Sequence, residues 1–161
     1  MQTEWSLEFS STLAAPVADV WRVITTWPGV NEELAPLMRM TCPPEASDKS
    51  VADAQTGVVL FRSWVLLFCF LPVDRHSLQL TRIDAGRGFL EESASWTQAY
   101  WRHERTMEPT PTGGCQLRDQ VRMRPRLRWF GPGVAWFIGK IFTNRHRRLR
   151  LRFGDAGAAQ N

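Results

Sequence analysis

The chain has few of the features that mark disulfide-bonded, metal-binding or membrane-spanning proteins. Its three cysteines, Cys42, Cys69 and Cys115, are odd in number and show no C-x-x-C spacing, which argues against a disulfide framework and against a zinc site. The longest apolar run, Trp64 to Pro72, has nine residues, and a helical membrane span needs about 20. The first residues contain no apolar signal region. We therefore expect a cytoplasmic protein that holds neither a metal ion nor a cofactor.

Acidic residues become scarce in the second part of the chain. Residues 1–99 contain twelve Asp and Glu against seven Lys and Arg, whereas residues 100–161 contain four against thirteen. A charge run is usually a solvated face, and we favour this interpretation. An anionic membrane surface is nevertheless a candidate partner of the basic C-terminal helix, while no specific nucleic-acid partner is expected.

The N-terminal part of the sequence predicts a strand and two helices. Alternating apolar residues indicate a strand over Glu4–Leu13. Pro16 suits the first position of a helix, and an apolar stripe follows it: Val17, Val20, Trp21, Ile24 and Trp27. A short second helix is predicted to begin with Asn31 as its cap.

The remaining sequence predicts six strands and a long helix. The strands are expected over Met38–Cys42, Gly57–Leu71, Arg75–Asp84, Phe89–Trp96, Ala99–Glu108 and Cys115–Arg126. After Gly131-Pro132-Gly133, a helix to about Phe153 carries the stripe Val134, Phe137, Ile138, Ile141, Phe142, Arg145, Leu149 and Phe153. This order predicts an α+β helix-grip fold, β-α-α-β6-α, in which a curved antiparallel sheet of about seven strands surrounds the C-terminal helix.

Two neighbouring predicted strands carry polar side chains toward the inside of the sheet. In the last strand, Leu117, Val121 and Met123 alternate with polar residues, so they form the buried side and carry Asp119 inward with them. A buried carboxylate needs a partner. The preceding strand offers Trp101-x-His103-x-Arg105, aligned by the turn Thr112-Gly113-Gly114. We therefore predict that Asp119 contacts His103 or Arg105 at the polar end of an apolar ligand cavity.

Five segments carry a family resemblance. Phe9–Trp21 looks like a strand leading into an A-P-x-x-x-V-W helix, Phe89–Ser93 like an F-x-D/E-E strand, Trp101–Arg105 like a W-x-H-x-H/R strand, Gly113–Val121 like a G-G-x-x-x-x-D-x-V strand, and Ile141–Arg145 like the start of a final helix segment. Together they resemble the SRPBCC, or START-like, ligand-binding superfamily, particularly its bacterial polyketide cyclase/dehydrase-like members. Ser93 and Arg105 depart from the pattern, because many relatives have glutamine and a second histidine at these places.

The resemblance implies one ligand-binding domain over residues 1–154, followed by a flexible tail over residues 155–161. It also implies an apolar tunnel between the sheet and the last helix that holds a lipid, a polyketide or another small hydrophobic molecule. The residues expected to bind this ligand face the tunnel from the sheet and the helix: Glu91, Trp101, His103, Arg105, Met107, Asp119, Met123, Phe137, Ile141 and Arg145.

Several side chains keep two interpretations. Either Glu91 or Glu92 faces the cavity, where it would pair with Arg105, because Phe89 and Leu90 are both apolar. Arg145 reaches either the rim or the polar end of the cavity. The run Trp64–Pro72 is apolar on both faces, so it is either covered by a partner or a second copy or touches a membrane with its tip. The interpretation we favour for His76 and His146 is exposure to solvent.

The sequence leaves three functions open, since the fold alone does not separate them. We favour a non-catalytic carrier or sensor of a hydrophobic small molecule. The second is a cyclase, aromatase or dehydrase in which His103 and Asp119 form a general-base dyad and Arg105 binds an enolate or carboxylate. The same residues are explained more simply as a buried ion-pair network between adjacent strands. The third is a membrane-surface or protein-interaction module whose cavity has lost its role.

Overall fold

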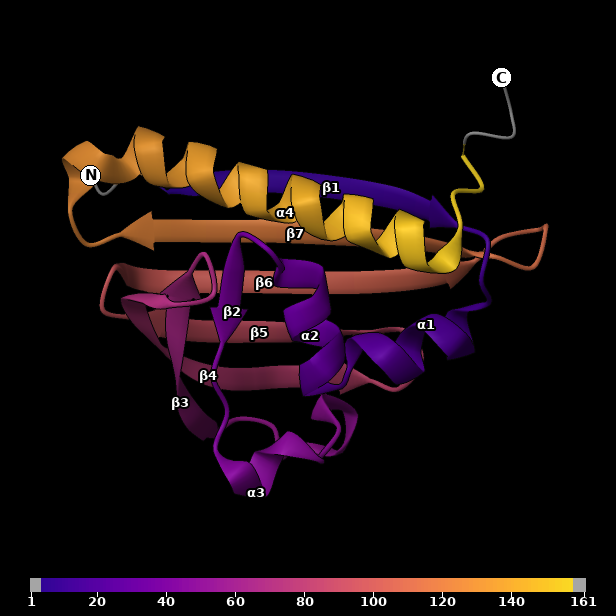
Figure 1. Cartoon of the computed structure of the whole chain (residues 1–161), viewed down its shortest axis with the longest axis horizontal. Coiled ribbons are helices and arrows are strands. Elements are labelled where there is room, and N and C mark those ends of the chain that lie inside the picture. Colours follow the sequence, from indigo (N-terminus) through magenta and orange to yellow (C-terminus); the bar gives the residue numbers. More distant parts are fainter. Residues whose placement is uncertain (1–3, 158–161) are drawn as a thin grey trace.

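The computed structural model of the chain describes residues 4–157. Its strands are β1 (Trp5–Leu13), β2 (Met38–Met40), β3 (Val59–Leu67), β4 (Leu71–Asp84), β5 (Gly88–Ser95), β6 (Gln98–Pro109) and β7 (Cys115–Pro125). Its α-helices are α1 (Val17–Ile24), α2 (Trp27–Leu34), α3 (Pro44–Ser47) and α4 (Gly131–Phe153), and two short 3₁₀ helices, η1 (Val51–Asp53) and η2 (Arg128–Phe130), lie between them. Figure 1 shows this arrangement.

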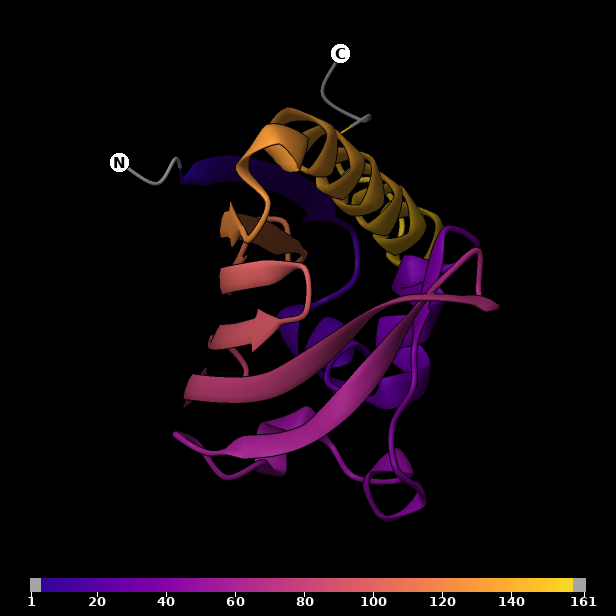
Figure 2. The same ribbon diagram turned by 90° about the vertical axis from the view of Figure 1, so that its left-hand side faces the viewer.

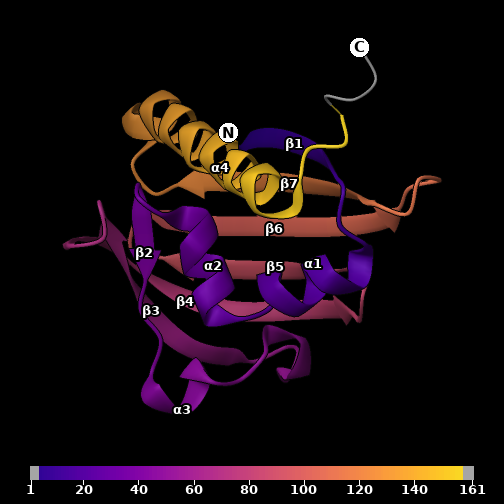
Figure 3. The same cartoon turned by 45° about the vertical axis from the view of Figure 1, so that its right-hand side comes forward.

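The strands form one antiparallel sheet of seven in the order β1-β7-β6-β5-β4-β3-β2. Register shifts interrupt the β3–β4, β4–β5 and β6–β7 pairings, and such irregularities bend a sheet and increase its twist. The sheet is accordingly curled, and α1, α2 and α4 all lie on its concave side (Figures 2 and 3). The predicted α+β helix-grip fold is confirmed.

Burial follows the alternation that the sequence predicted for β7. Leu117, Asp119, Val121 and Met123 are buried, whereas the side chains between them point to the exposed outer face. A tightly buried apolar cluster lies below α1, between this helix, the C-terminal half of α4 and the concave face of the sheet: Leu13, Val20, Ile24, Met107, Cys115, Leu117 and Leu149. This cluster fills one end of the concave face and leaves the other end to the site described below.

The boundary between the first two helices differs from the prediction. Helix α1 ends at Ile24, and Trp27 already belongs to α2, whose N-cap is Thr26: its hydroxyl accepts a hydrogen bond from the Gly29 N–H at 3.1 Å. Asn31 is therefore not a cap. Its side-chain amide instead makes two hydrogen bonds to the backbone of Met40, at 3.0 and 2.8 Å, and fastens β2 to α2.

The predicted strand Gly57–Leu71 is also divided. Strand β3 ends at Leu67 because Phe68 and Cys69 adopt positive φ angles of 50° and 69°, which turn the chain into β4. The apolar run Trp64–Pro72 thus forms the tip of a hairpin. Strand β4 begins four residues earlier than expected, at Leu71 rather than at Arg75.

The end of the chain returns to β1. Asp155 forms an isolated bridge with Leu13, and the Ala156 N–H donates to the Thr12 carbonyl at 3.0 Å. The rest of the predicted tail, residues 158–161, lies outside the described residues, as do residues 1–3. Within residues 4–157, no helix is both long and apolar enough to cross a membrane.

Candidate ligand-binding site

A cavity of about 510 Å³ lies between the concave face of the sheet and the helices α2 and α4. Helix α4 packs on β1, β7 and α2, so the curled half of the sheet formed by β3, β4 and β5 remains at a distance from it. The wall is mainly apolar, with side chains that include Trp27, Leu34, Val65, Leu78, Leu80, Trp101, Phe137, Ile138, Ile141 and Phe142. Its volume is in the range of small-molecule sites.

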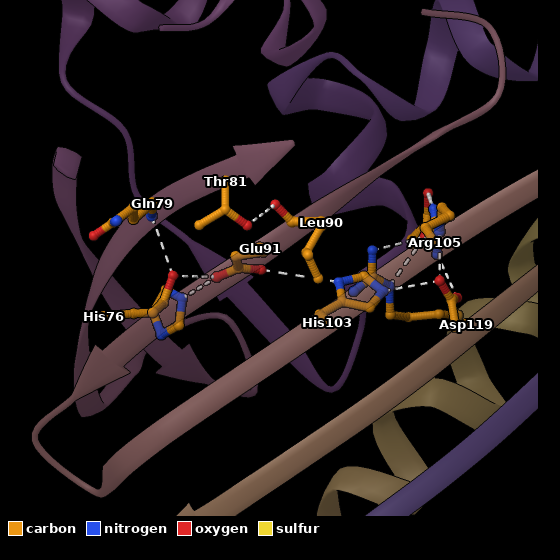
Figure 4. Close-up of polar contacts among 11 residues, drawn as sticks. His76, Gln79, Thr81, Leu90, Glu91, His103, Arg105 and Asp119 are labelled. Atoms are coloured by element: carbon orange, nitrogen blue, oxygen red, sulfur yellow. Dashed lines mark hydrogen bonds and ion pairs between the residues drawn. The ribbon is translucent and has the colours of Figure 1, made fainter. Parts of the chain in front are cut away.

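One side of this apolar cavity is polar. His76, Glu91 and His103, from β4, β5 and β6, line it side by side. His76 Nε2 lies 2.5 Å from Glu91 Oε1, and His103 Nδ1 lies 3.9 Å from Glu91 Oε2. The Ser93 hydroxyl also donates to Glu91, at 2.9 Å. We call His76, Glu91 and His103 the polar wall; Figure 4 shows its contacts.

Behind the polar wall, the guanidinium of Arg105 lies between two carboxylates. Its Nε and Nη2 donate to the two oxygens of Asp119 at 2.7 and 2.8 Å. Its Nη1 and Nη2 donate to the two oxygens of Glu33, on α2, at 3.0 Å each. Arg105 is only 1% exposed and Asp119 0%. Such paired contacts match the planar fork of arginine to a carboxylate on each side.

Each carboxylate also holds a residue of the surrounding site. Asp119 lies 2.8 Å from His103 Nε2 and 3.0 Å from Nε2 of His146, a residue of α4. Glu33 accepts a hydrogen bond from Nε of Arg145, also on α4, at 2.9 Å. His103 and Arg145 line the cavity, so the ion pairs behind the wall fix the orientation of the groups in it.

The electrostatics of these groups favour charged carboxylates. Burial acts to raise the pKa of Asp119, but Arg105 and His103 hold it well below its ordinary value. Burial opposes ionisation of Glu33 in the same way, and Arg105 and Arg145 lower its pKa nevertheless. In the polar wall, burial likewise acts against the charge of Glu91, yet His76 and His103 lower its pKa to about 2. Burial lowers the pKa of His76, and the stronger pull of Glu91 and Asp74 raises it overall.

The structure places the predicted site residues in two groups. Glu91, Trp101, His103, Phe137, Ile141 and Arg145 line the cavity. Arg105 and Asp119 do not line it, because they lie behind the polar wall. Met107 and Met123 do not line it either: both are buried, and Met107 belongs to the apolar cluster below α1.

Three expectations about single side chains need correction. Of the two neighbouring glutamates, Glu91 faces inward, and it pairs with His76 rather than with Arg105. The expected exposure of His76 and His146 is wrong, since they are only 8% and 3% exposed. Of the two positions that the sequence left open for Arg145, the structure shows the inner one, since Arg145 is buried and pairs with Glu33.

Sequence reasoning missed three residues, and two of them carried a signal. His76 alternates with Leu78 and Leu80 along β4, so period two already placed it inside. His146 follows Phe142 by four residues and therefore continues the buried stripe of α4. Glu33 carried no such signal, because its partners Arg105 and Arg145 are 72 and 112 residues away along the chain.

Two further polar groups line the cavity near one end. Gln98 is buried, and its Oε1 has no hydrogen-bond partner within residues 4–157. Asp74 is held by the hydroxyls of Ser95 and Thr97 at 2.6 and 2.7 Å. Among all the residues that the structure describes, 4–157, no three His, Cys, Asp or Glu side chains are placed to hold a metal ion together.

Comparison with known proteins identifies the family. The sequence profile of a family described as Domain of unknown function (DUF8410) matches residues 11–153. The chain belongs to this family. No curated protein matches the sequence.

Several solved structures have a similar fold at low sequence identity. Protein CV1439 from Chromobacterium violaceum is similar with a TM-score of 0.66 and 13% identity, over 92% of this chain and 97% of that chain. A START superfamily protein from Mycobacterium smegmatis has a TM-score of 0.64 and 8% identity, with 92% and 96% covered. Ara h 8.0201 has a TM-score of 0.57 and 11% identity, over 91% of this chain and 98% of that chain. The DUF8410 chain therefore has the fold of the START/SRPBCC superfamily.

The buried ion pairs predict a large loss of stability when one partner is removed. Asp119→Ala leaves Arg105 paired on one side only and should lower the free energy of unfolding by about 3–5 kcal/mol. Glu8→Ala is a matched control on the neighbouring strand, because Glu8 and its partner Arg118 are both more than half exposed, and it should change stability by less than about 1 kcal/mol. Chemical denaturation of both variants checks this. Equal losses would contradict the network.

The polar wall predicts a pH window of stabilisation. His76 has a raised pKa, so its contribution is complete below the ordinary value of 6.5 and is lost as the pH rises through the pKa in the folded protein. Glu91 has a lowered pKa, so its contribution is complete above 4.5 and is lost as the pH falls toward about 2. The stability difference between wild type and Glu91→Gln should therefore be largest between pH 4.5 and 6.5.

Denaturation curves across this pH range measure that difference. Glu92→Gln, on the outer face of the same strand, is the control and should stay within about 0.5 kcal/mol of wild type throughout. A difference that does not vary with pH for Glu91→Gln would show that its carboxylate is not paired with His76.

Proposed function

We propose that this protein is a non-catalytic carrier or sensor that binds one small, largely apolar molecule in the cavity between the sheet and α4, with residues 4–154 acting as one ligand-binding domain. The proposal rests on one observation: a mainly apolar cavity holds only a few polar groups, and most of these belong to the polar wall or are fixed by hydrogen bonds and ion pairs. Apolar walls provide the affinity, and a few fixed polar groups orient the ligand. We propose a lipid-like or polyketide-like molecule as this ligand.

The chemistry of the polar wall favours an uncharged ligand group. Glu91 carries a negative charge at the cavity surface and its partner His76 is already bound to it, so a ligand carboxylate beside Glu91 would meet a like charge without a new cation to pair with. Arg145 could offset this charge, but its guanidinium is already bound to Glu33. A hydroxyl group can donate to Glu91 or to the unpartnered Oε1 of Gln98, and it can accept from a histidine. We therefore infer an alcohol or another neutral polar group on the ligand.

Ligand competition tests this inference. Nile red, a neutral dye, should bind to the wild type, and decanol should displace it at least about tenfold more effectively than decanoate. In Glu91→Gln the preference should fall below about threefold, since the like-charge contact is removed. Better displacement by decanoate in the wild type would contradict the assignment of a neutral group.

A cavity-filling variant controls for binding elsewhere. Ile138 lines the cavity, and Ile138→Trp should abolish dye binding while the protein stays folded. Leu151→Trp adds the same ring on the exposed C-terminal half of α4 and should bind the dye like the wild type. Equal dye binding by Ile138→Trp would place the dye outside the cavity.

One observation favours a second function, a cyclase, aromatase or dehydrase acting on a polyketide-like chain. Asp119 holds His103 by Nε2, and the imidazole lines the cavity with Nδ1 on the side of Glu91. In that case, His103→Ala should lower the turnover of an added poly-β-ketone about 10²–10⁴-fold with little change in binding. For a carrier, His103→Ala lowers only the affinity, and the wild type shows no turnover. Chromatography of the products separates the two functions.

A further inference from the structure

The exposed large apolar side chains gather at one end of the molecule. Among the described residues, nine of them belong to the β3–β4 hairpin, the β5–β6 turn and the segment from the end of β7 into α4: Phe68, Phe70, Leu71, Val73, Trp96, Leu127, Trp129, Phe130 and Trp136. The exposed fraction reaches 73% for Phe70 and 85% for Trp129. We call these nine side chains the aromatic rim.

The antiparallel register explains why these segments meet at one end. The β3–β4 hairpin closes at Leu67–Leu71, His76 pairs with Ser95 just before the β5–β6 turn, and Gln98 pairs with Pro125 just after it. The ends of β3, β5 and β7 therefore share one edge of the sheet, where α4 begins. Figure 1 shows this edge on its left, and Figure 2 faces it.

The cavity opens at the same end. Of the side chains and glycines that line it, only Val73, Thr97, Phe130 and Gly133 are also exposed to solvent. All four belong to the start of β4, the β5–β6 turn, η2 or the first turn of α4. The aromatic rim thus surrounds the mouth of the cavity, and Val73 and Phe130 belong to both.

Positive charges outnumber negative ones around the mouth. Residues 120–154 contain no Asp or Glu, and Arg124, Arg126, Arg128 and Lys140 come from this stretch. None of these four makes an ion pair with a described residue. The carboxylate of Asp74 is turned toward Ser95 and Thr97 by hydrogen bonds. A mouth of this kind attracts an anionic surface.

We propose that the aromatic rim docks on an anionic lipid bilayer, so that the cavity mouth faces the acyl chains and an apolar ligand passes between bilayer and cavity without crossing water. Tryptophan and phenylalanine side chains insert at the level of the headgroups, and nearby arginines bind anionic lipid. The apolar side chains project from separate turns with arginines between them, which suits a fluid headgroup layer better than the continuous apolar core of a protein interface.

This surface differs from the basic half of α4 that the sequence suggested. There, Arg148 donates to the Glu32 carbonyl, Arg152 pairs with the Glu32 carboxylate, and Arg150 binds Ser11 and lies near Asp155. These three arginines are occupied by neighbouring elements. The free cations with exposed aromatic neighbours lie at the other end of the helix.

Vesicle co-sedimentation tests the proposal with the intact protein. Wild type should bind vesicles of phosphatidylcholine with about 30% phosphatidylserine at least tenfold more strongly than pure phosphatidylcholine vesicles, and high salt should weaken the binding. Arg128→Glu and Trp129→Ala, which change exposed side chains, should each reduce this binding about fivefold or more. The matched controls at the far half of α4, Arg147→Glu and Leu151→Ala, should stay within about twofold of wild type.

Two results would overturn the proposal. One is the absence of binding to either kind of vesicle by the wild type, which would leave the rim to a protein partner. The other is an equal loss in the control variants, which would move the contact to the basic half of α4. Neither Arg128 nor Trp129 lines the cavity, so Nile red binding without vesicles should be unchanged in these variants. A loss of dye binding in Arg128→Glu or Trp129→Ala would count against the ligand site of the proposed function and not against membrane docking.

Discussion

The buried guanidinium of Arg105, between Glu33 and Asp119, is the interaction on which the site depends. It joins α2 to β6 and β7, and Asn144 of α4 strengthens the same junction by donating to the backbone carbonyls of Glu33 and Ala35 at 3.2 and 2.9 Å. Burying these charges has a large desolvation cost, which close paired geometry offsets. The two carboxylates in turn hold the side chains around them. Asp119 binds His103 and His146, and Glu33 binds Arg145, so fixing the carboxylates fixes these three side chains.

The cavity follows from the same arrangement. The network and the apolar cluster below α1 occupy one part of the concave face, where α4 lies close to β1 and β7. Toward β3, β4 and β5 the sheet curls away, and the side chains there line an open space instead of meeting α4. The polar wall stands at the boundary of the two regions, held by its own His76–Glu91 pair and by the contact of His103 with Asp119. Most of the cavity lining is therefore apolar, with three fixed polar groups side by side in the polar wall.

Periodicity predicted much of this from sequence. Alternation in β7 placed Asp119 inside, and the pairing of β6 with β7 then sets Arg105 directly opposite it. What alternation could not predict was the third partner: Glu33 reaches Arg105 through the docking of α2, a contact between distant segments that local patterns do not encode. Alternation also has a limit within the sheet, as Met107 shows. It predicted correctly that Met107 points inward, but it could not tell whether the side chain packs against a helix or lines the cavity, and Met107 packs in the apolar cluster below α1. The hairpin at Phe68 was missed since its residues are apolar where turns are usually polar.

Native mass spectrometry of the freshly purified protein can show whether the apolar cavity holds one neutral small molecule against its pre-oriented polar wall. We expect a single adduct of one neutral molecule per chain on the wild type, removed by organic extraction, restored by added decanol, and absent from Ile138→Trp. A wild type that keeps the bare chain mass even after incubation with decanol, or an adduct that persists on Ile138→Trp, would contradict it.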